Sequence, residues 1–362
     1  MKRLPAFTLI LIFLLAACGG DDDDATTTNT NTDADPTPVV VVAQGAQDIL
    51  SDVQARGVLR CGVQDSLPGF GFQNDDGEFL GLDTDVCRVL AAAIFGTRDQ
   101  VEFVSLTTSE RFPALAAGDI DVLIRNSTFN LSRDAEIGFD FGPIVFYDGQ
   151  GVLVRRGEGI FELSDLNEAQ VCVQPDTTTQ PNFAETMAAL DLTYEEVSVT
   201  DHDDGVAKLA AGECDAFTAD RSALVSQQAT QDSPNDFSVL EVVLSQEPLA
   251  PVYREGDARW GNVIRWSIYG VIHAERLGIT SENIDDFRNS GIQEIELLLG
   301  EQGDLGNKLG LQNSFVAQAV AQVGNYGEIY AENLGVDSGI GLARGQNALW
   351  TAGGLVYAPP FR

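Results

Sequence analysis

Short apolar runs alternate with segments of helical periodicity over most of this 362-residue chain. One nine-residue pattern occurs twice, as Leu115–Leu123 (LAAGDIDVL) and Leu209–Phe217 (LAAGECDAF). Each copy is typical of a helix end, a glycine that can adopt the left-handed C-terminal conformation, an acidic turn and a buried strand. Polar residues follow each of these strands. The repeat therefore predicts two α/β units of the same plan, with polar side chains at their strand ends.

The order of the predicted elements divides the chain into two lobes. Strands are expected at 58–63, 101–104, 120–124, 150–155, 169–174, 193–197, 216–219 and 237–244. After Asp257 the pattern is mostly helical, with helices expected at 260–277, 292–299 and 314–334. We therefore predict lobe 1 from residues 47–148, lobe 2 from 149–247, and a return to lobe 1 with a C-terminal helical extension over 248–362. The chain then crosses between the lobes twice, which makes a two-strand hinge that bends more readily than it twists.

The N-terminus has the features of an export signal. Residues 1–17 combine a charged start with a short apolar run and are predicted to be a lipoprotein signal peptide. Leu15–Cys18 is similar to the bacterial lipoprotein processing box, which implies that Cys18 is lipidated. The alternative is an ordinary signal peptide cut near Ala17. Residues 18–46, which are rich in Asp, Thr and Asn between Gly19 and Pro38, predict an acidic disordered tether. We expect a protein of the periplasm or the outer face of the cytoplasmic membrane, held there only by lipid.

The charge balance and the motif content exclude several classes of function. A formal net charge of -34, from 55 acidic and 21 basic residues, repels polyanions, so no nucleic-acid partner is expected. No phosphate loop, dinucleotide fingerprint or serine-nucleophile signature occurs, and no cysteine spacing resembles a zinc site. We expect His202 in solvent and His273 on a helix surface or in a satisfied core position. The sequence thus predicts a monomeric binding protein without cofactor or metal, and not an enzyme.

Four cysteines remain after Cys18, an even number that suits disulfides in an oxidising compartment. Cys172 and Cys214 lie on strands expected to be neighbours in lobe 2, and the same logic pairs Cys61 with Cys87 in lobe 1. Pairing within each lobe leaves the lobes free to move. Pairing between lobes, the alternative, would lock them together.

Polar residues at the strand ends fit a small zwitterion, whose buried charges both need partners. Arg133 is the candidate for a carboxylate, because a guanidinium offers a bidentate fork; the alternative is a surface residue. Thr128 and Asn126 precede it and add hydroxyl and amide contacts. Thr177, Thr178 and Thr179 precede a helix whose free N–H groups favour an anion, unless one threonine simply caps that helix. Asp220 is the candidate partner for an ammonium, and its alternative is to cap the helix that follows.

Further candidates surround this set. Phe70 or Phe72, in a Pro/Gly-rich loop, is a candidate wall for a side-chain pocket, although most aromatic residues are core. Arg111 and Arg125 are able to meet an acidic ligand side chain, but pairing with a local carboxylate is the expected role of each.

Motifs in both lobes and in the tail resemble one known family, the general L-amino-acid-binding proteins of polar amino acid ABC transporters. In chain order they are Leu67–Phe70, Gly81–Arg88, Glu110–Phe112, Arg125–Asn126, Leu131–Asp134, Tyr147–Gly151, Val171–Gln174, Thr177–Thr179, Cys214–Asp215, Glu247–Leu249, Val323–Glu328 and Tyr357–Pro360. The resemblance covers nearly everything after the tether.

This resemblance implies a type II periplasmic-binding fold that captures an external L-amino acid by lobe closure and delivers it to an ABC permease with its ATPase. Positions matching Arg133 and Thr128 hold the carboxylate in the family, the loop matching Thr177–Thr179 assists, and the position matching Asp220 holds the ammonium. Pro175-Asp176 replaces the glycine-containing loop usual before the threonines. The alternative function is an enzyme on the same fold, such as a cyclohexadienyl dehydratase-like lyase.

Overall fold

The computed structural model describes residues 48–136 and 138–362. The signal peptide expected at 1–17, the lipidation of Cys18 and the tether expected at 18–46 lie outside the described residues.

The first lobe is built on a five-stranded sheet of order β5-β1-β6-β15-β7. β1 (Leu59–Val63) lies parallel to β5 (Val101–Ser105) and to β6 (Val122–Leu123). β15 (Val252–Arg254) returns from the second lobe and lies antiparallel to β6 and to β7 (Phe139–Phe141). A segment from late in the chain therefore completes the first sheet, as expected for a lobe interrupted by another lobe.

The second lobe repeats this arrangement, with strand order β11-β10-β12-β9-β13. β10 (Ala169–Val173) lies parallel to β11 (Tyr194–Ser198) and to β12 (Ala216–Asp220). β9 (Gln150–Arg155) lies antiparallel to β12 and to β13 (Phe237–Val239), so the pairing order and strand directions match those of the first sheet. The repeated sequence pattern supplies β6 in one lobe and β12 in the other.

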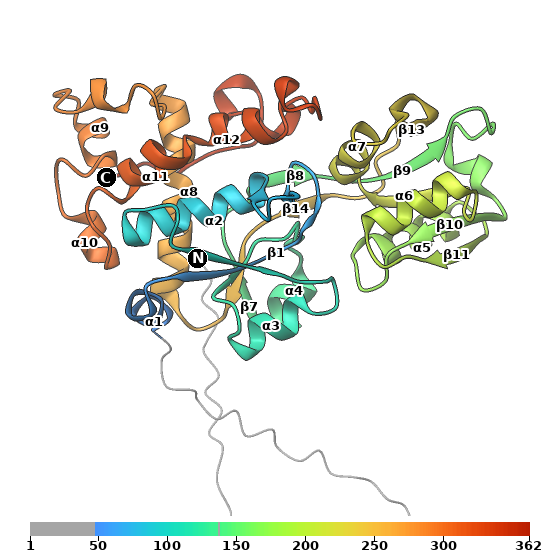
Figure 1. Ribbon diagram of the computed structural model, residues 1–362, viewed down its shortest axis with the longest axis horizontal. Coiled ribbons are helices and arrows are strands. Elements are labelled where there is room, and N and C mark those ends of the chain that lie inside the picture. The colour runs from blue at the N-terminus through green and yellow to red at the C-terminus, as the bar shows by residue number, and fades with distance from the viewer. Residues whose placement is uncertain (1–47, 137) are drawn as a thin grey trace, which may run out of the picture. The chain divides into compact units, whose positions relative to one another are not determined.

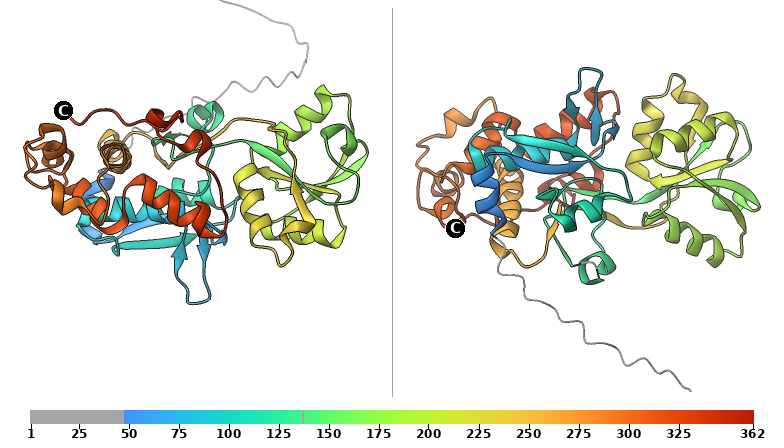
Figure 2. Two further views of the ribbon diagram at one scale, coloured as in Figure 1. Left: turned by 90° about the horizontal axis from the view of Figure 1, so that it is seen from above. Right: turned by 60° about the horizontal axis from the view of Figure 1, so that its bottom comes forward.

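Two short strands connect the lobes (Figure 1). β8 (Phe146–Asp148) leads into the second lobe and β14 (Glu247–Leu249) leads back. They pair antiparallel, with Asp148 opposite Glu247. The hinge is therefore a two-stranded ribbon, and the fold is the type II periplasmic-binding architecture that the sequence predicts. A separate three-stranded sheet, of β2 (Ser66–Leu67), β3 (Gly71–Gln73) and β4 (Phe79–Leu80), projects from the first lobe (Figure 2).

Helices cover both sheets. The α-helices are α1 (Ile49–Arg56), α2 (Leu82–Phe95), α3 (Arg111–Ala117), α4 (Leu131–Glu136), α5 (Thr179–Ala189), α6 (His202–Ala211), α7 (Arg221–Ala229), α8 (Ala258–Leu277), α9 (Gln293–Leu298), α10 (Leu305–Leu309), α11 (Phe315–Val323) and α12 (Tyr326–Asn333). Short 3-10 helices occur at Leu163–Leu166, Pro234–Asp236, Ile284–Phe287, Val336–Ser338, Gly345–Asn347 and Trp350–Ala352.

The glycines of the repeated pattern terminate equivalent helices. Gly118 has φ 80° and closes α3, and Gly212 has φ 76° and closes α6. A residue with a β-carbon is strained in this left-handed conformation, which explains why each copy carries glycine here.

The core of the second lobe follows from strand alternation. Leu153 and Phe217 pack on one face of the sheet, whereas Val152, Val154 and Ala216 pack on the other. Successive side chains of a strand point to opposite faces, so two apolar layers form from one sheet that helices cover on both sides.

Both disulfides form within a lobe. Cys61 bonds to Cys87 and ties β1 to α2, and Cys172 bonds to Cys214 beside the start of β12. Neither bond crosses the hinge, so the disulfides do not prevent the lobes from moving relative to each other.

In the C-terminal region, α10 was not predicted and one predicted helix is divided. The single helix expected at 314–334 is two helices, α11 and α12, which meet at Gly324 and Asn325. The Asn325 side chain accepts from the Glu328 N–H and the Glu328 side chain accepts from the Asn325 N–H, a capping box that starts a new helix. Gly324, at φ 107°, permits the change of direction.

The tail, to which the sequence assigned no role, reaches the hinge. The buried Asn347 side chain accepts from the N–H of Tyr147 in β8 at 2.6 Å and donates to its carbonyl at 3.0 Å. Arg344 pairs with Glu275 and lies over the rings of Tyr326 and Tyr330. The tail thus binds β8 as an additional strand would.

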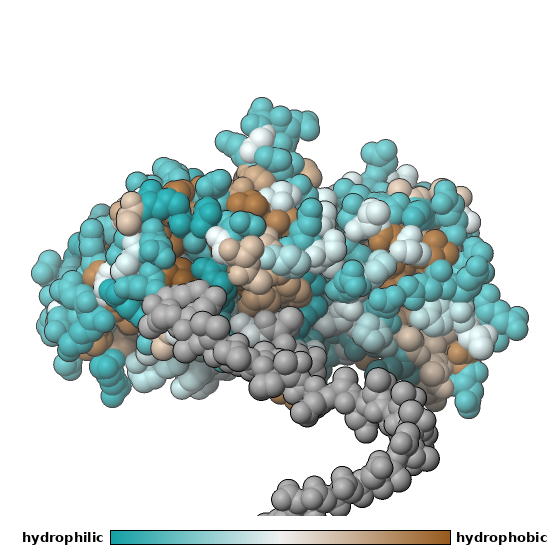
Figure 3. Space-filling view, turned by 90° about the horizontal axis from the view of Figure 1, so that it is seen from below, coloured by the Kyte–Doolittle hydropathy of each residue, from teal (hydrophilic) through white to brown (hydrophobic). Residues whose placement is uncertain are grey.

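The face shown in Figure 3 is largely hydrophilic, with small separate apolar areas. This agrees with the strongly acidic composition. In the described part of the chain, no helix has the length and apolar content needed to span a bilayer.

Candidate functional site

The strand ends of the two lobes meet in one polar cleft. Its lining comes from both lobes and consists of Gln64, Thr108, Arg111, Arg125, Asn126, Thr128, Arg133, Gln174, Thr177, Thr178, Thr179, His202, Ala219 and Asp220. The structure therefore brings together seven of the predicted ligand-binding residues: Arg133, Thr128, Asn126, Thr177, Thr178, Thr179 and Asp220. The Gln174 side chain donates to the Thr108 hydroxyl across the cleft at 2.9 Å.

Arg133 lies in α4 and is buried, not a surface residue. Its Nη1 donates to the carbonyl of Thr128 at 2.9 Å, and its guanidinium lies 5.3 Å from the centre of the Phe112 ring. Burial lowers the pKa of Arg133, while the carboxylates of Glu247 and Asp220 raise it. A buried guanidinium held by one carbonyl retains donors for a further anion.

Thr128 and Thr178 come from opposite lobes and meet at Glu247 of the hinge strand β14. Glu247 Oε2 accepts from the Thr128 hydroxyl at 2.6 Å and from the Thr178 hydroxyl at 2.9 Å. Each hydroxyl has a single proton, so both threonines present only acceptor lone pairs while this contact persists. Glu247 had no predicted role, because its position under both threonines depends on how the hinge crosses the cleft.

The three threonines lie at the start of α5, as predicted, but none caps the helix with its side chain. Thr178 occupies the N-cap position without a side-chain capping bond. The Thr177 hydroxyl instead donates to the Gln174 carbonyl at 2.7 Å. Before them, Asp176 has φ 61°, a conformation that favours glycine. The aspartate therefore occupies a backbone position that suits the glycine of the usual loop.

Asp220 ends β12 and occupies the N-cap position of α7, yet its side chain makes no capping bond. The carboxyl group lines the cleft instead. Burial raises the pKa of Asp220 well above its usual value, and the carboxylates of Asp148 and Glu247 add to this effect, while Arg133 and Arg111 oppose it. The Asp220 carboxylate is therefore a group whose charge needs a cationic partner to be stable.

Asn126 has φ 39°, and its side chain faces the cleft. Its N–H donates to the Asp83 carboxylate at 3.0 Å, and its Oδ1 accepts from Gln64. Among the described residues, its buried Nδ2 has no hydrogen-bond partner.

Arg111 and Arg125 also line the cleft, although a local carboxylate pair was the expected role of each. Arg125 Nε donates to the Leu106 carbonyl at 2.7 Å, and burial lowers its pKa to about 10 against the opposing charges of Asp83, Asp65 and Asp201. Arg111 begins α3, and nothing in its local pattern showed that this helix start faces the cleft.

His202 is not in open solvent, as the sequence suggested, but contributes to the cleft lining. Burial and the neighbouring Arg125 lower its pKa to about 4, so the ring is neutral near pH 7. His273 is buried in α8 against Glu294 and Arg276, the core alternative of the prediction.

Phe70 and Phe72 are not among the cleft-lining residues. Phe70 is fully buried and packs edge-on against Phe146 at 5.2 Å, so it joins the hinge to the first lobe. Phe72 lies in β3, in the separate three-stranded sheet. A Pro/Gly-rich loop with aromatic residues does not by itself distinguish a pocket wall from a core anchor.

Comparison with known proteins gives one family. The family model of bacterial extracellular solute-binding proteins, family 3, matches residues 59–259. A glutamate/glutamine/aspartate/asparagine-binding protein of Rhodobacter capsulatus is 45% identical over 324 residues, covering 89% of this chain and 96% of its own. A general L-amino acid-binding periplasmic protein of Rhizobium johnstonii is 41% identical over 315 residues, which cover 86% of this chain and 92% of that protein.

A solved structure extends the comparison to the whole fold. An ABC transporter periplasmic binding protein from Brucella ovis with glutathione bound superposes with a TM-score of 0.85 at 42% identity, covering 87% of this chain and all of its own. These relatives are binding proteins of transporters, which does not favour the lyase alternative. The chain belongs to the bacterial extracellular solute-binding proteins, family 3.

Proposed function

We propose that this protein captures L-amino acids outside the cytoplasm by closing its two lobes and delivers them to an ABC permease with its ATPase. One observation carries the proposal. A buried guanidinium from the first lobe, Arg133, and a partly buried carboxyl group from the second, Asp220, face the same cleft. The names of the relatives, which bind amino acids, support the same class of ligand.

The two ends of a zwitterion go to different lobes in this proposal. The ligand carboxylate lies between the Arg133 fork and the N–H groups at the start of α5. The ligand ammonium pairs with Asp220 and favours its ionised form. Since neither lobe alone satisfies both charges, the ligand binds the closed form better and shifts the population toward it.

Glu247 links this step to the hinge. A ligand carboxylate that accepts a hydrogen bond from the Thr128 or Thr178 hydroxyl replaces Glu247 as the acceptor of that bond. Binding then alters a contact on the strand that bends when the lobes close.

The N-terminus completes the proposal. A lipid on Cys18 and the acidic segment at 18–46 hold a monomeric body close to the membrane that carries the permease. The mass of the mature protein tests the anchor, because an unlipidated N-terminus would contradict it.

Isothermal titration of the purified mature protein with a panel of L-amino acids tests the function. Arg133→Ala removes the carboxylate partner, and loss of one member of a buried charge pair weakens binding about 30-fold or more. Arg288→Ala is the matched control, since Arg288 is more exposed and pairs with Asp285. Unchanged affinity in Arg133→Ala, with wild-type folding by circular dichroism, would rule out this site.

A further inference from the structure

The cleft carries more positive charge than a zwitterionic ligand needs. Its lining includes three arginines, Arg111, Arg125 and Arg133, but one carboxylate, Asp220. His202 stays neutral near pH 7 because burial lowers its pKa. A ligand with one carboxylate and one ammonium satisfies Arg133 and Asp220 and offers no anionic group to the other two arginines. In a protein of net charge -34 this local excess is a feature of the site and not of the composition.

The two remaining arginines differ in their surroundings. Arg125 has a hydrogen bond from Nε to the Leu106 carbonyl, and the charges of Asp83, Asp65 and Asp201 favour its cationic form. Local groups therefore hold Arg125, although among the described residues it forms no ion pair with a carboxylate, which is the role that the sequence predicts.

Arg111 lacks a hydrogen bond of this kind. Across residues 48–136 and 138–362, its guanidinium makes no hydrogen bond and no ion pair, and Nε is buried without a partner. It lies over the Phe112 ring at 4.8 Å, while Arg133 lies 5.3 Å from the centre of the same ring. Burial lowers its pKa well below the usual value, repulsion from Arg125 and Arg133 adds to this effect, and the charges of Asp220 and Asp176 oppose it. A buried, unpaired guanidinium is costly and is retained where something else supplies its anion.

A second unpaired donor lines the same cleft. The Asn126 side chain gives its oxygen to Gln64, and its Nδ2 is buried without a partner in the described part of the chain. Arg111 and Asn126 thus both offer N–H groups to a cleft in which no described residue supplies a further acceptor for them. Their shared requirement is an oxygen-rich anionic group.

We propose that Arg111 binds a second carboxylate of the ligand, so that the preferred ligands carry one ammonium and two carboxylates. This inference rests on the proposed function and adds the role of the ligand side chain. Arg133 and Asp220 hold the backbone charges, and Arg111, assisted by Asn126 Nδ2, selects an acidic side chain. L-glutamate, L-aspartate and reduced glutathione share this chemistry and differ in the spacing of their carboxylates.

The test compares L-glutamate with L-glutamine, which has nearly the same shape without the second charge. Titration calorimetry on the wild-type protein should give a tighter Kd for L-glutamate. Arg111→Gln should weaken L-glutamate binding about 10- to 150-fold, the range for a charged hydrogen bond, and change L-glutamine binding less than about 3-fold. Arg111→Lys keeps the charge without the fork and should give an intermediate loss. Arg288→Gln, in an exposed pair, is the matched control and should change neither Kd.

The outcomes separate this inference from the proposed function. A wild-type protein that binds no amino acid contradicts both. Binding of L-glutamine as tight as that of L-glutamate in the wild-type protein overturns this inference alone, and it requires no variant that folds. Equal losses for the two ligands in Arg111→Gln, or loss of selectivity in Arg125→Gln but not in Arg111→Gln, also overturn it. Separate titrations of L-aspartate and reduced glutathione then identify the spacing of the two carboxylates that the cleft accepts best.

Discussion

One arrangement of hydrogen bonds, called the polar clamp below, occurs in both lobes at equivalent positions of the two copies of the repeated pattern. Asp121 in the first copy and Asp215 in the second each bond twice to one residue of the neighbouring strand segment. Asp121 accepts from the Arg60 N–H at 2.8 Å and donates its own N–H to the Arg60 carbonyl at 2.9 Å. Asp215 does the same with Gln170, at 2.8 and 2.7 Å. The second half of the pattern therefore fixes how its strand registers on the next.

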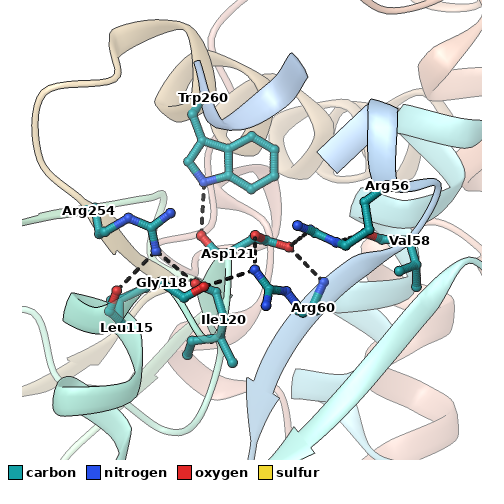
Figure 4. Close-up of polar contacts among 9 residues, drawn as sticks. All are labelled: Arg56, Val58, Arg60, Leu115, Gly118, Ile120, Asp121, Arg254 and Trp260. Carbon is teal, nitrogen blue, oxygen red and sulfur yellow. Dashed lines mark hydrogen bonds and ion pairs between the residues drawn. The ribbon is translucent and has the colours of Figure 1, made fainter. Parts of the chain in front are cut away.

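An arginine completes each clamp from the antiparallel strand. Arg254 of β15 donates to the carbonyls of Leu115 and Ile120 in the first lobe (Figure 4). Arg155 of β9 donates to Leu209 and Cys214, the equivalent positions of the second copy. Both arginines tie a helix end to the beginning of the following strand, although β15 and β9 enter their sheets from different parts of the chain.

The two clamps differ in the residues that surround Asp121 and Asp215. Asp121 is buried, forms ion pairs with Arg56 of α1 and with Arg60, and its carbonyl accepts from the Trp260 indole of α8 (Figure 4). Burial raises the pKa of Asp121 despite these arginines. Asp215 is partly exposed and, in the described residues, has no ion pair. One local geometry thus has a larger energetic role where the N-terminal helix and the C-terminal extension enclose it.

The largest expected effect follows from this contrast. Asp121→Ala leaves two arginines and a backbone N–H without their acceptor in a buried site and should lower the free energy of unfolding by about 3 to 5 kcal/mol. Asp215→Ala removes one hydrogen bond near solvent and should lower it by about 1 kcal/mol. Urea denaturation of both variants measures the two losses. Equal losses in the two variants would mean that the burial and ion pairs of Asp121 add nothing to the free energy of unfolding.

The helix starts next to the cleft give a second contrast. The first turn of α2 contains the buried Asp83, which accepts from the Asn126 N–H, whereas the equivalent helix of the second lobe, α5, begins with Thr179. The first lobe therefore places its own carboxyl group in the first turn of this helix, while the first turn of α5 contains no acidic side chain.

The buried Asp83 of the first lobe predicts a contribution to the pH dependence of stability. Burial raises the pKa of Asp83 to about 7, against about 3.9 in an unfolded chain. The native state thus holds a proton that the unfolded state releases, so the Asp83 contribution is full below about pH 4 and is lost as pH rises toward 7. The steepest decline is about 1.4 kcal/mol per pH unit. Urea denaturation between pH 4 and 8 should show this decline in the wild-type protein and a flatter profile in Asp83→Asn, and parallel profiles would contradict the assignment.

The sequence predicted the parts of the site that local pattern specifies. Arg133, Asp220 and Thr177–Thr179 follow a strand or open a helix, and parallel strands place their carboxyl ends at one edge. Arg111 and Glu247 acquire their roles only when α3 and the hinge dock against the cleft, which no local pattern records. Phe70 was predicted to line a pocket but lies in the core. Its contact with Phe146 joins residues far apart in the chain, so the local loop sequence could not show this role.

The break between α11 and α12 has a different physical cause. Apolar periodicity continues through Gly324, so the pattern over 314–334 favours one helix. The reciprocal capping bonds of Asn325 and Glu328 compensate the N–H groups of a new helix end, and such a capping box outweighs periodicity. Boundaries of this kind depend on single side chains and not on the repeat of apolar positions.

A substitution in the C-terminal tail tests whether the hinge strand β8 unfolds with the first lobe. Asn347→Ala removes both bonds to Tyr147 and leaves a peptide N–H and carbonyl unpaired, which should lower the free energy of unfolding by about 1 to 3 kcal/mol. Gln346→Ala, at an exposed neighbouring position, is the matched control and should cost less than about 0.5 kcal/mol. Because the described hydrogen bonds of the Asn347 side chain all go to Tyr147 of β8, hydrogen exchange should accelerate over 146–148 in Asn347→Ala and remain unchanged in β10 and β12 of the second lobe. Acceleration in both regions would mean that the two lobes unfold as one unit, and the hinge would then belong to neither.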